Sequence, residues 1–171
     1  FGDGGAACIV GRSRPGALEI NQVCLGADGA LGDLLSLPAG GSRNPATEAT
    51  LKEGRHYISM EGKEVFKHAV RRMEAASKAS IAVAGIQEEQ VGWLVPHQAN
   101  ERIIDAIAKR FNISEAKVFK SLYKYGNTAA SSLGIALDEL LNTETVLPHE
   151  YLLLTAFGGG LSWGSVVLEQ V

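Results

Sequence analysis

The sequence predicts an α/β domain with a mixed β-sheet, and two observations lead to this prediction. Five short apolar segments bounded by glycine, proline or polar turns are typical of strands, and they cover residues 6–10, 18–25, 91–95, 151–156 and 164–168. Three other segments carry apolar residues at three- and four-residue spacing, which is typical of amphipathic helices. Because these helices alternate with the strands along the chain, we expect them to pack against one five-stranded sheet.

Each predicted helix has one apolar face. The first begins near Glu61 and Glu64, whose charges suit a helix amino terminus, and its apolar face comprises Val65, Phe66, Ala69, Val70, Met73 and Ala76. The second runs from about Asn100 to Phe111 with Ile103, Ile104 and Ile107 on one side, and Asn100 is a candidate N-cap. The third runs from about Ala129 to Leu141, and we expect its buried residues to be Leu133, Ala136, Leu137 and Leu140.

Composition excludes several classes of protein. The chain has 171 residues, a length that suits one domain, with 46% hydrophobic residues, 20% charged residues and a net charge of −3. These values do not fit a disordered chain or a strongly basic nucleic-acid binder. No apolar run approaches the roughly 20 residues that span a bilayer, so we expect no membrane role.

The two cysteines and four histidines do not indicate a metal site. Cys8 and Cys24 are not spaced as zinc ligands or as a disulfide framework, and no two histidines have metal-ligand spacing. Apolar neighbours flank both cysteines, so we expect them to be small buried hydrophobes. Residues 36–55 are rich in proline, glycine and charge, and they predict a surface loop long enough to have a function.

Three segments place polar groups or bare backbone at tight turns. His97 follows a predicted strand and precedes a helix, at the edge of the sheet where α/β sites form; the alternative is a partly buried histidine with no further role. Asn127 follows a glycine and precedes a helix, so it either caps that helix or donates a hydrogen bond into a site. The glycines 158–160 form a hairpin turn or bring backbone N–H groups to a reacting carbonyl. They lack the residues of a nucleotide-binding loop.

The two ends of the chain resemble each other. An aromatic–glycine segment, residues 1–5, leads into the apolar residues 7–10, just as residues 157–160 lead into residues 165–168. This echo suggests duplicated halves. The chain opens on Phe1 rather than on methionine, and we therefore expect upstream sequence to be missing.

Several motifs together resemble the C-terminal half of the β-ketoacyl-acyl-carrier-protein synthase III family. They are Phe1-Gly2-Asp3-Gly4, Pro38-Ala39-Gly40-Gly41-Ser42, Met60-Glu61-Gly62-Lys63-Glu64-Val65-Phe66, Pro96-His97-Gln98-Ala99-Asn100, Gly126-Asn127-Thr128-Ala129-Ala130-Ser131 and Phe157-Gly158-Gly159-Gly160-Leu161-Ser162-Trp163-Gly164. The resemblance implies a thiolase-like fold of two equivalent halves. Residues 1–17 would then be the end of the N-terminal half, including its last strand, and residues 18–171 the C-terminal domain.

The resemblance also implies roles for individual residues. His97 and Asn127 match the family's catalytic pair, and Gly159 matches a glycine whose N–H helps to form the oxyanion hole. Asn100, Gly62 and Phe66 match positions along the pantetheine tunnel. Lys67, Arg102, Lys109 and Arg110 match helix faces that meet the acidic acyl carrier protein, although a merely solvated basic face is an equal alternative.

The implied reaction is the decarboxylative condensation of acyl-CoA with malonyl-acyl carrier protein, which initiates fatty acid synthesis. The resemblance implies no cofactor, with the coenzyme A thioester as a substrate, and it implies a cytoplasmic homodimer (or the plastid stroma in a plant). Neither Cys8 nor Cys24 matches the nucleophile motif, so we expect the chain alone to be inactive without the N-terminal half. The residues leave three alternatives open: a secondary-metabolite condensing enzyme, a non-catalytic partner half, and a truncated or proteolysed product.

Overall fold

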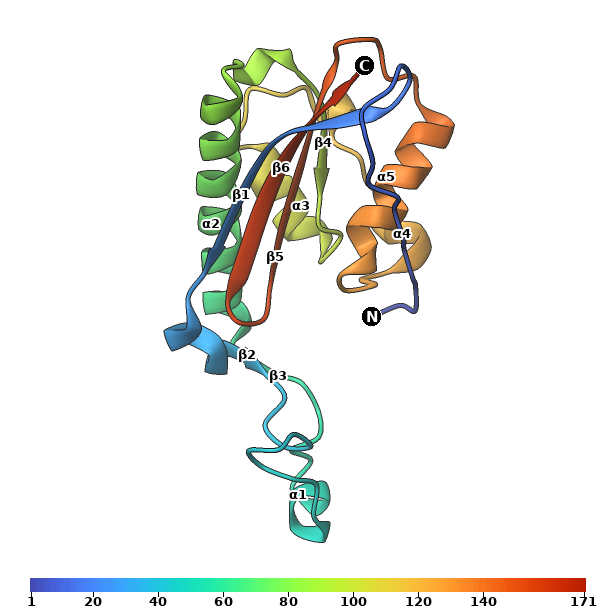
Figure 1. Ribbon diagram of the computed structural model, residues 1–171. Helices are drawn as coiled ribbons and strands as arrows, with labels where there is room; N and C mark the ends of the chain where they lie inside the picture. Colours follow the sequence, from blue (N-terminus) through green and yellow to red (C-terminus); the bar gives the residue numbers. More distant parts are fainter.

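A four-stranded mixed sheet forms the centre of the molecule in the computed structural model, which describes residues 1–171 (Figure 1). Its strands are β1 (Leu18–Ala27), β4 (Val91–Pro96), β5 (Tyr151–Gly158) and β6 (Ser162–Gln170). They lie in the order β1-β6-β5-β4. Only β4 and β5 are parallel, and the other two pairs are antiparallel.

Five helices and a small second sheet complete the fold. The helices are α1 (Glu48–Lys52), α2 (Gly62–Ala84), α3 (Glu101–Ala108), α4 (Leu122–Tyr125) and α5 (Ser131–Thr143). The second sheet pairs β2 (Leu35–Ser36) with β3 (Ser59–Met60). Short 3-10 helices cover Gly29–Leu34, Glu88–Gln90 and Glu115–Lys117. None of the helices is both long and apolar enough to cross a membrane.

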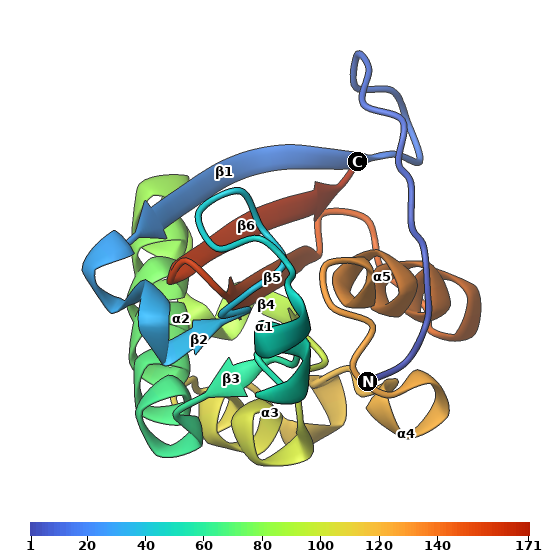
Figure 2. The ribbon, with the colours of Figure 1, turned by 90° about the horizontal axis from the view of Figure 1, so that it is seen from below.

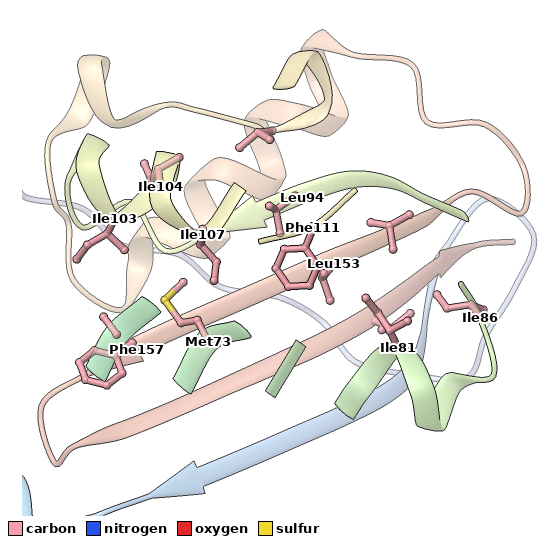
Figure 3. Packing of buried hydrophobic residues seen from close by; sticks show 14 of the residues in the cluster. Met73, Ile81, Ile86, Leu94, Ile103, Ile104, Ile107, Phe111, Leu153 and Phe157 are labelled. Carbon is pink, nitrogen blue, oxygen red and sulfur yellow. The ribbon is translucent and has the colours of Figure 1, made fainter. Parts of the chain in front are cut away.

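The two faces of the sheet pack against different helices. Because side chains alternate across a strand, Leu152 and Leu153 of β5 point to opposite faces. Leu153 belongs to the cluster that includes α2 and α3, with Met73 and Ile104 nearby in Figure 3. Leu152 belongs to a second cluster with Leu140 of α5. The three predicted helices, the predicted apolar faces of α2 and α3, and four of the five predicted strands are therefore confirmed.

The fifth predicted strand does not form in this chain, so the sheet has four strands rather than the expected five. Residues 6–10 form no strand and make no backbone hydrogen bond, and the side chains of Ile9 and Val10 are exposed. An apolar segment becomes a strand only where a neighbouring strand completes its ladder, and no strand lies beside this one. The chain instead runs past α4 and along α5 (Figure 2). The prediction of buried cysteines is wrong for the same reason: Cys8 on this segment is exposed, and Cys24 on the edge strand β1 is only partly buried.

The loop at residues 36–55 extends away from the body of the molecule (Figure 1). It contains one element that sequence patterning missed, the short helix α1. Thr47 and Thr50 hold its first turn, because each side chain accepts a hydrogen bond from the other residue's backbone N–H, at 3.2 and 2.8 Å.

Candidate functional site

An open cavity of about 1170 Å³ lies on the face of the sheet that α5 only partly covers. His97, Asn127 and Gly159 all line it, although they come from three separate segments: the end of β4, the turn before α5, and the β5–β6 turn. Most of the remaining lining is apolar, including Leu133, Leu154 and other side chains, and none of it is Lys, Arg, Asp or Glu. The cavity therefore presents a few polar groups against an apolar wall, as binding sites commonly do.

The sheet itself holds His97 in place. Its backbone N–H donates to the carbonyl of Thr155 on β5 at 2.8 Å, which extends the parallel ladder one residue beyond β4. Its ring nitrogen Nδ1 lies 2.5 Å from the hydroxyl of Ser132, in the first turn of α5. The imidazole is thus tied to a strand through its backbone and to a helix through its ring.

The Ser132 contact favours one tautomer of the His97 ring. The Ser132 hydroxyl oxygen already accepts from the backbone N–H of Gln98 at 3.3 Å, and the residue is 2% exposed. Its own proton has no acceptor other than His97 Nδ1, and a buried hydroxyl donates wherever it can. This arrangement favours Nδ1 as the acceptor, with the proton of the neutral ring on Nε2.

Burial also keeps this histidine neutral. The pKa of His97 is lowered from the ordinary value of 6.5, because desolvation disfavours the charged imidazolium. No acidic side chain lines the cavity to oppose this effect. At neutral pH His97 is therefore a neutral hydrogen-bond donor rather than a cation.

Asn127 presents the other donor. Its side-chain oxygen Oδ1 accepts from the backbone N–H of Ala129 at 2.9 Å, and Ala129 has the unusual φ of 52°. This bond fixes the orientation of the carboxamide and leaves the NH₂ group without a protein acceptor. α5 begins only at Ser131 and has no side-chain cap, so capping this helix is not what Asn127 does.

Gly159 contributes backbone rather than a side chain. It follows β5 in the turn to β6, and its N–H donates to no carbonyl or side chain. A free N–H beside the cavity can bind an oxygen that carries developing negative charge. The structure thus places three unused donors, from His97, Asn127 and Gly159, around one cavity.

Sequence reasoning missed Gln98, whose side chain is 1% exposed and forms four hydrogen bonds. Its amide NH₂ donates to the carbonyls of Pro96 at 2.7 Å and Phe119 at 3.3 Å. Its oxygen accepts from the backbone N–H groups of Ser121 at 2.9 Å and Leu122 at 3.1 Å. Gln98 therefore joins the end of β4, which carries His97, to α4, which leads into the Asn127 turn.

The three residues predicted to line a tunnel lie outside this cavity. Asn100 caps α3, as its sequence position suggested, because its side-chain oxygen accepts from the N–H of Ile103 at 2.9 Å. Gly62 opens α2 and is exposed, and a Cβ added there would meet no neighbouring atom. Phe66 lies farther along α2 and lines a different hollow. Their roles along a tunnel remain predictions.

A second hollow, of about 620 Å³, lies between α2 and α3 and is largely basic. Lys67, Lys109 and Arg110 line it together with Phe66, and the Arg102 guanidinium lies 5.8 Å from the centre of the Phe66 ring. The four predicted basic residues are thus brought together on one surface. Lys67 pairs with Glu64 at 3.2 Å, and Arg110 pairs with the half-buried Glu74 at 3.6 Å. Ion pairs with an exposed partner are weak enough to exchange partners.

Neutral donors around an apolar cavity of an α/β domain form a class of site that can stabilise charge on a carbonyl oxygen. Residues 81–170 match the family model described as 3-oxoacyl-[acyl-carrier-protein] synthase III C terminal, and the chain belongs to this family.

Known relatives agree with this assignment. The β-ketoacyl-[acyl-carrier-protein] synthase III of Chlamydia pneumoniae is 74% identical over all 171 residues of this chain, which correspond to 51% of that protein. The corresponding protein of Roseiflexus sp. is 48% identical over 99% of this chain and 51% of its own length. The crystal structure of 3-oxoacyl-[acyl-carrier-protein] synthase III from Aquifex aeolicus matches 92% of this chain and 46% of its own, with 40% identity and a TM-score of 0.77. The chain therefore has a thiolase-like fold and spans about half the length of its curated relatives.

Proposed function

We propose that this chain is the half of a β-ketoacyl-acyl-carrier-protein synthase III that binds and decarboxylates the malonyl thioester. One observation carries the proposal: a neutral His97 and the free carboxamide NH₂ of Asn127 line the same apolar cavity. Two neutral donors suit a thioester carbonyl oxygen that becomes an enolate oxygen as carbon dioxide leaves.

The first chemical step of the proposal is decarboxylation. The bond between the malonyl α-carbon and its carboxylate breaks, carbon dioxide leaves, and the electron pair moves into the thioester as an enolate. His97 Nε2–H and Asn127 NH₂ hold the enolate oxygen. Because no Lys or Arg lines the cavity, the malonyl carboxylate finds no counter-ion there, and its conversion to a neutral gas is favoured.

The second step forms the new carbon–carbon bond. The enolate carbon attacks the carbonyl of an acyl group held on a cysteine, and the carbonyl oxygen becomes an oxyanion. The Gly159 N–H helps to hold this oxygen until it collapses and expels the cysteine thiolate. That cysteine is not one of this chain's own, since neither Cys8 nor Cys24 lines the cavity. The chain by itself holds half of the site and condenses nothing.

The proposed reaction has two substrates. Acyl-CoA supplies the acyl group, no cofactor takes part, and malonyl-acyl carrier protein delivers the malonyl group. The acidic carrier protein docks on the basic hollow around Lys67, Arg102, Lys109 and Arg110. Its pantetheine arm passes Phe66, Gly62 and Asn100 on the way to the cavity.

The rest of the molecule completes the assembly that we propose. Residues 1–17 belong to the other half, where residues 6–10 add the last strand to its sheet. This accounts for an apolar segment that lacks a partner strand in the chain alone. The complete protein is a homodimer of the cytoplasm.

The test is condensation by the full-length protein, measured as 3-oxoacyl-acyl carrier protein formed from acyl-CoA and malonyl-acyl carrier protein. Asn127→Asp keeps the shape of the side chain but replaces its donor with a carboxylate, and we expect it to lower the rate by about a hundredfold or more. Asn142→Asp is the matched control, because this exposed side chain donates only to the carbonyl of Asp138. No product from the unaltered protein, or equal rates for the two variants, would overturn the proposal.

A further inference from the structure

Arg72 of α2 has an environment unlike that of the other basic residues on this helix. Its guanidinium Nη2 lies 3.0 Å from the Asp28 carboxylate, and its Cζ lies 4.4 Å from the centre of the Trp163 ring. The Arg72 and Asp28 side chains are only 28% and 30% exposed. An arginine held between a carboxylate and an aromatic face is restrained in both position and orientation.

Both residues that Arg72 contacts are linked to the turn that contains Gly159. The N–H of Asp28 donates to the carbonyl of Leu161 at 2.8 Å, and the N–H of Leu161 donates back to the carbonyl of Asp28 at 3.0 Å. Leu161 follows Gly159 by two residues and is 1% exposed. Trp163 lies two residues farther on, in β6. Arg72 therefore connects α2 to the β5–β6 turn by two routes.

The turn around Gly159 combines flexible backbone with several restraints. Residues 158–160 are three consecutive glycines, which have the greatest backbone freedom of any residue type. An oxyanion donor has to be held within about 0.5 Å of its productive position. Within the hairpin Gly158 pairs with Ser162, whose hydroxyl donates to the Gly159 carbonyl at 3.0 Å, and the backbone bonds with Asp28 tie the turn to the end of β1. Arg72 in turn ties that end to α2.

We propose that Arg72 is a positioning residue for the Gly159 N–H. It touches no substrate, and it acts by holding Asp28 and Trp163 at fixed places against α2, so that the turn between them presents the Gly159 N–H to the cavity. The role rests on the proposed function of Gly159 as an oxyanion donor.

The first experiment measures the partial reactions of the full-length protein. Removing an oxyanion donor outright costs about a hundred- to a thousandfold in kcat, so displacing one costs less. We expect Arg72→Ala to lower kcat for condensation about ten- to a hundredfold, with the KM for malonyl-acyl carrier protein unchanged within about twofold. Malonyl decarboxylation depends on His97 and Asn127 and is expected to persist. Arg72→Lys keeps a positive charge for Asp28 but not the flat contact with Trp163, and we expect its kcat to lie between those of Arg72→Ala and the unaltered protein.

Lys78→Ala is the control, because Lys78 lies on the same helix and loses an ion pair with Glu74 at 2.9 Å. It is expected to leave every rate unchanged. A kcat for Arg72→Ala within twofold of the unaltered protein, or an equal fall of condensation and decarboxylation, would refute the positioning role. If Arg72→Ala does not fold, the isosteric Asp28→Asn variant decides by the same criteria.

A second measurement does not depend on the activity. Hydrogen–deuterium exchange of the peptide spanning residues 157–163 is expected to become several-fold faster in Arg72→Ala and to stay unchanged in Lys78→Ala. Unchanged exchange in both variants would refute the anchoring of the turn even if activity fell. If exchange is faster in Arg72→Ala but the unaltered protein catalyses no condensation, the anchoring of the turn by Arg72 stands and only the proposed function is refuted.

Discussion

Replacing Gln98 with methionine tests whether the His97 and Asn127 segments are held together by one buried amide. Methionine has nearly the length and volume of glutamine, so the substitution removes the polar atoms without opening a large space. Four backbone groups then lose their partners, namely the carbonyls of Pro96 and Phe119 and the N–H groups of Ser121 and Leu122. The change is therefore a deletion of hydrogen bonds rather than of packing.

The expected loss follows from this count of four groups. A buried polar group without a partner costs about 1–3 kcal/mol. At the lower end of that range, because the loops can relax, four groups give a loss of about 4 kcal/mol in the free energy of unfolding. With a slope of about 2 kcal/mol per molar urea, this lowers the urea midpoint by about 2 M.

Urea unfolding followed by circular dichroism measures this loss directly. Gln22→Met is the matched control, since the Gln22 side chain donates only to the carbonyl of its neighbour Val23 on the edge strand. We expect the control to change the free energy of unfolding by less than about 0.5 kcal/mol. A loss below about 1 kcal/mol for Gln98→Met would show that the four bonds do not hold these segments together.

Two further predictions concern pH and the carrier protein. Because burial lowers the pKa of His97, the unfolded chain binds a proton at this residue at a higher pH than the folded chain does. The free energy of unfolding therefore falls as the pH drops from 6.5 toward the lowered pKa of His97. In unfolding experiments from pH 8 to 5, His97→Gln is expected to make this fall smaller. The acid limb of the decarboxylation rate is expected to be centred below pH 6.5, and a limb centred at or above pH 6.5 would contradict a neutral buried donor. On the basic hollow, Arg102→Glu combined with Lys109→Glu is expected to raise the KM for malonyl-acyl carrier protein about tenfold or more, while leaving the KM for malonyl-CoA within twofold. If steady-state kinetics show an equal rise in KM for both substrates, these residues act on the shared malonyl thioester and not on the carrier protein.

The fold was predictable where local pattern and burial agree. Ile103, Ile104 and Ile107 predict one face of α3, and all three are buried in the structure. Residues 6–10 have an equally clear apolar pattern but form no strand, because a strand depends on a neighbour that local sequence does not specify.

The site was predictable only in part, for a similar reason. His97 and Asn127 stand out because the motifs around them, Pro96-His97-Gln98-Ala99-Asn100 and Gly126-Asn127-Thr128-Ala129-Ala130-Ser131, resemble those of a known family; polar residues at turns are common in themselves. Ser132 has no such signal: it lies 35 residues from His97, and only the packing of α5 brings its hydroxyl to the ring. The contact between Arg72 and Asp28 likewise joins residues 44 positions apart. The residues that orient the donors are thus determined by tertiary contacts rather than by motifs.

The central claim is that His97 acts on the malonyl thioester and not on the transfer of the acyl group to cysteine. His97→Ala in the full-length protein separates these two steps, since radiolabelled acyl-CoA reports acylation of the cysteine and labelled carbon dioxide reports decarboxylation. Decarboxylation is expected to fall about a hundredfold or more, while acylation stays within about threefold of the unaltered rate. An equal collapse of both reactions would contradict the role given to His97.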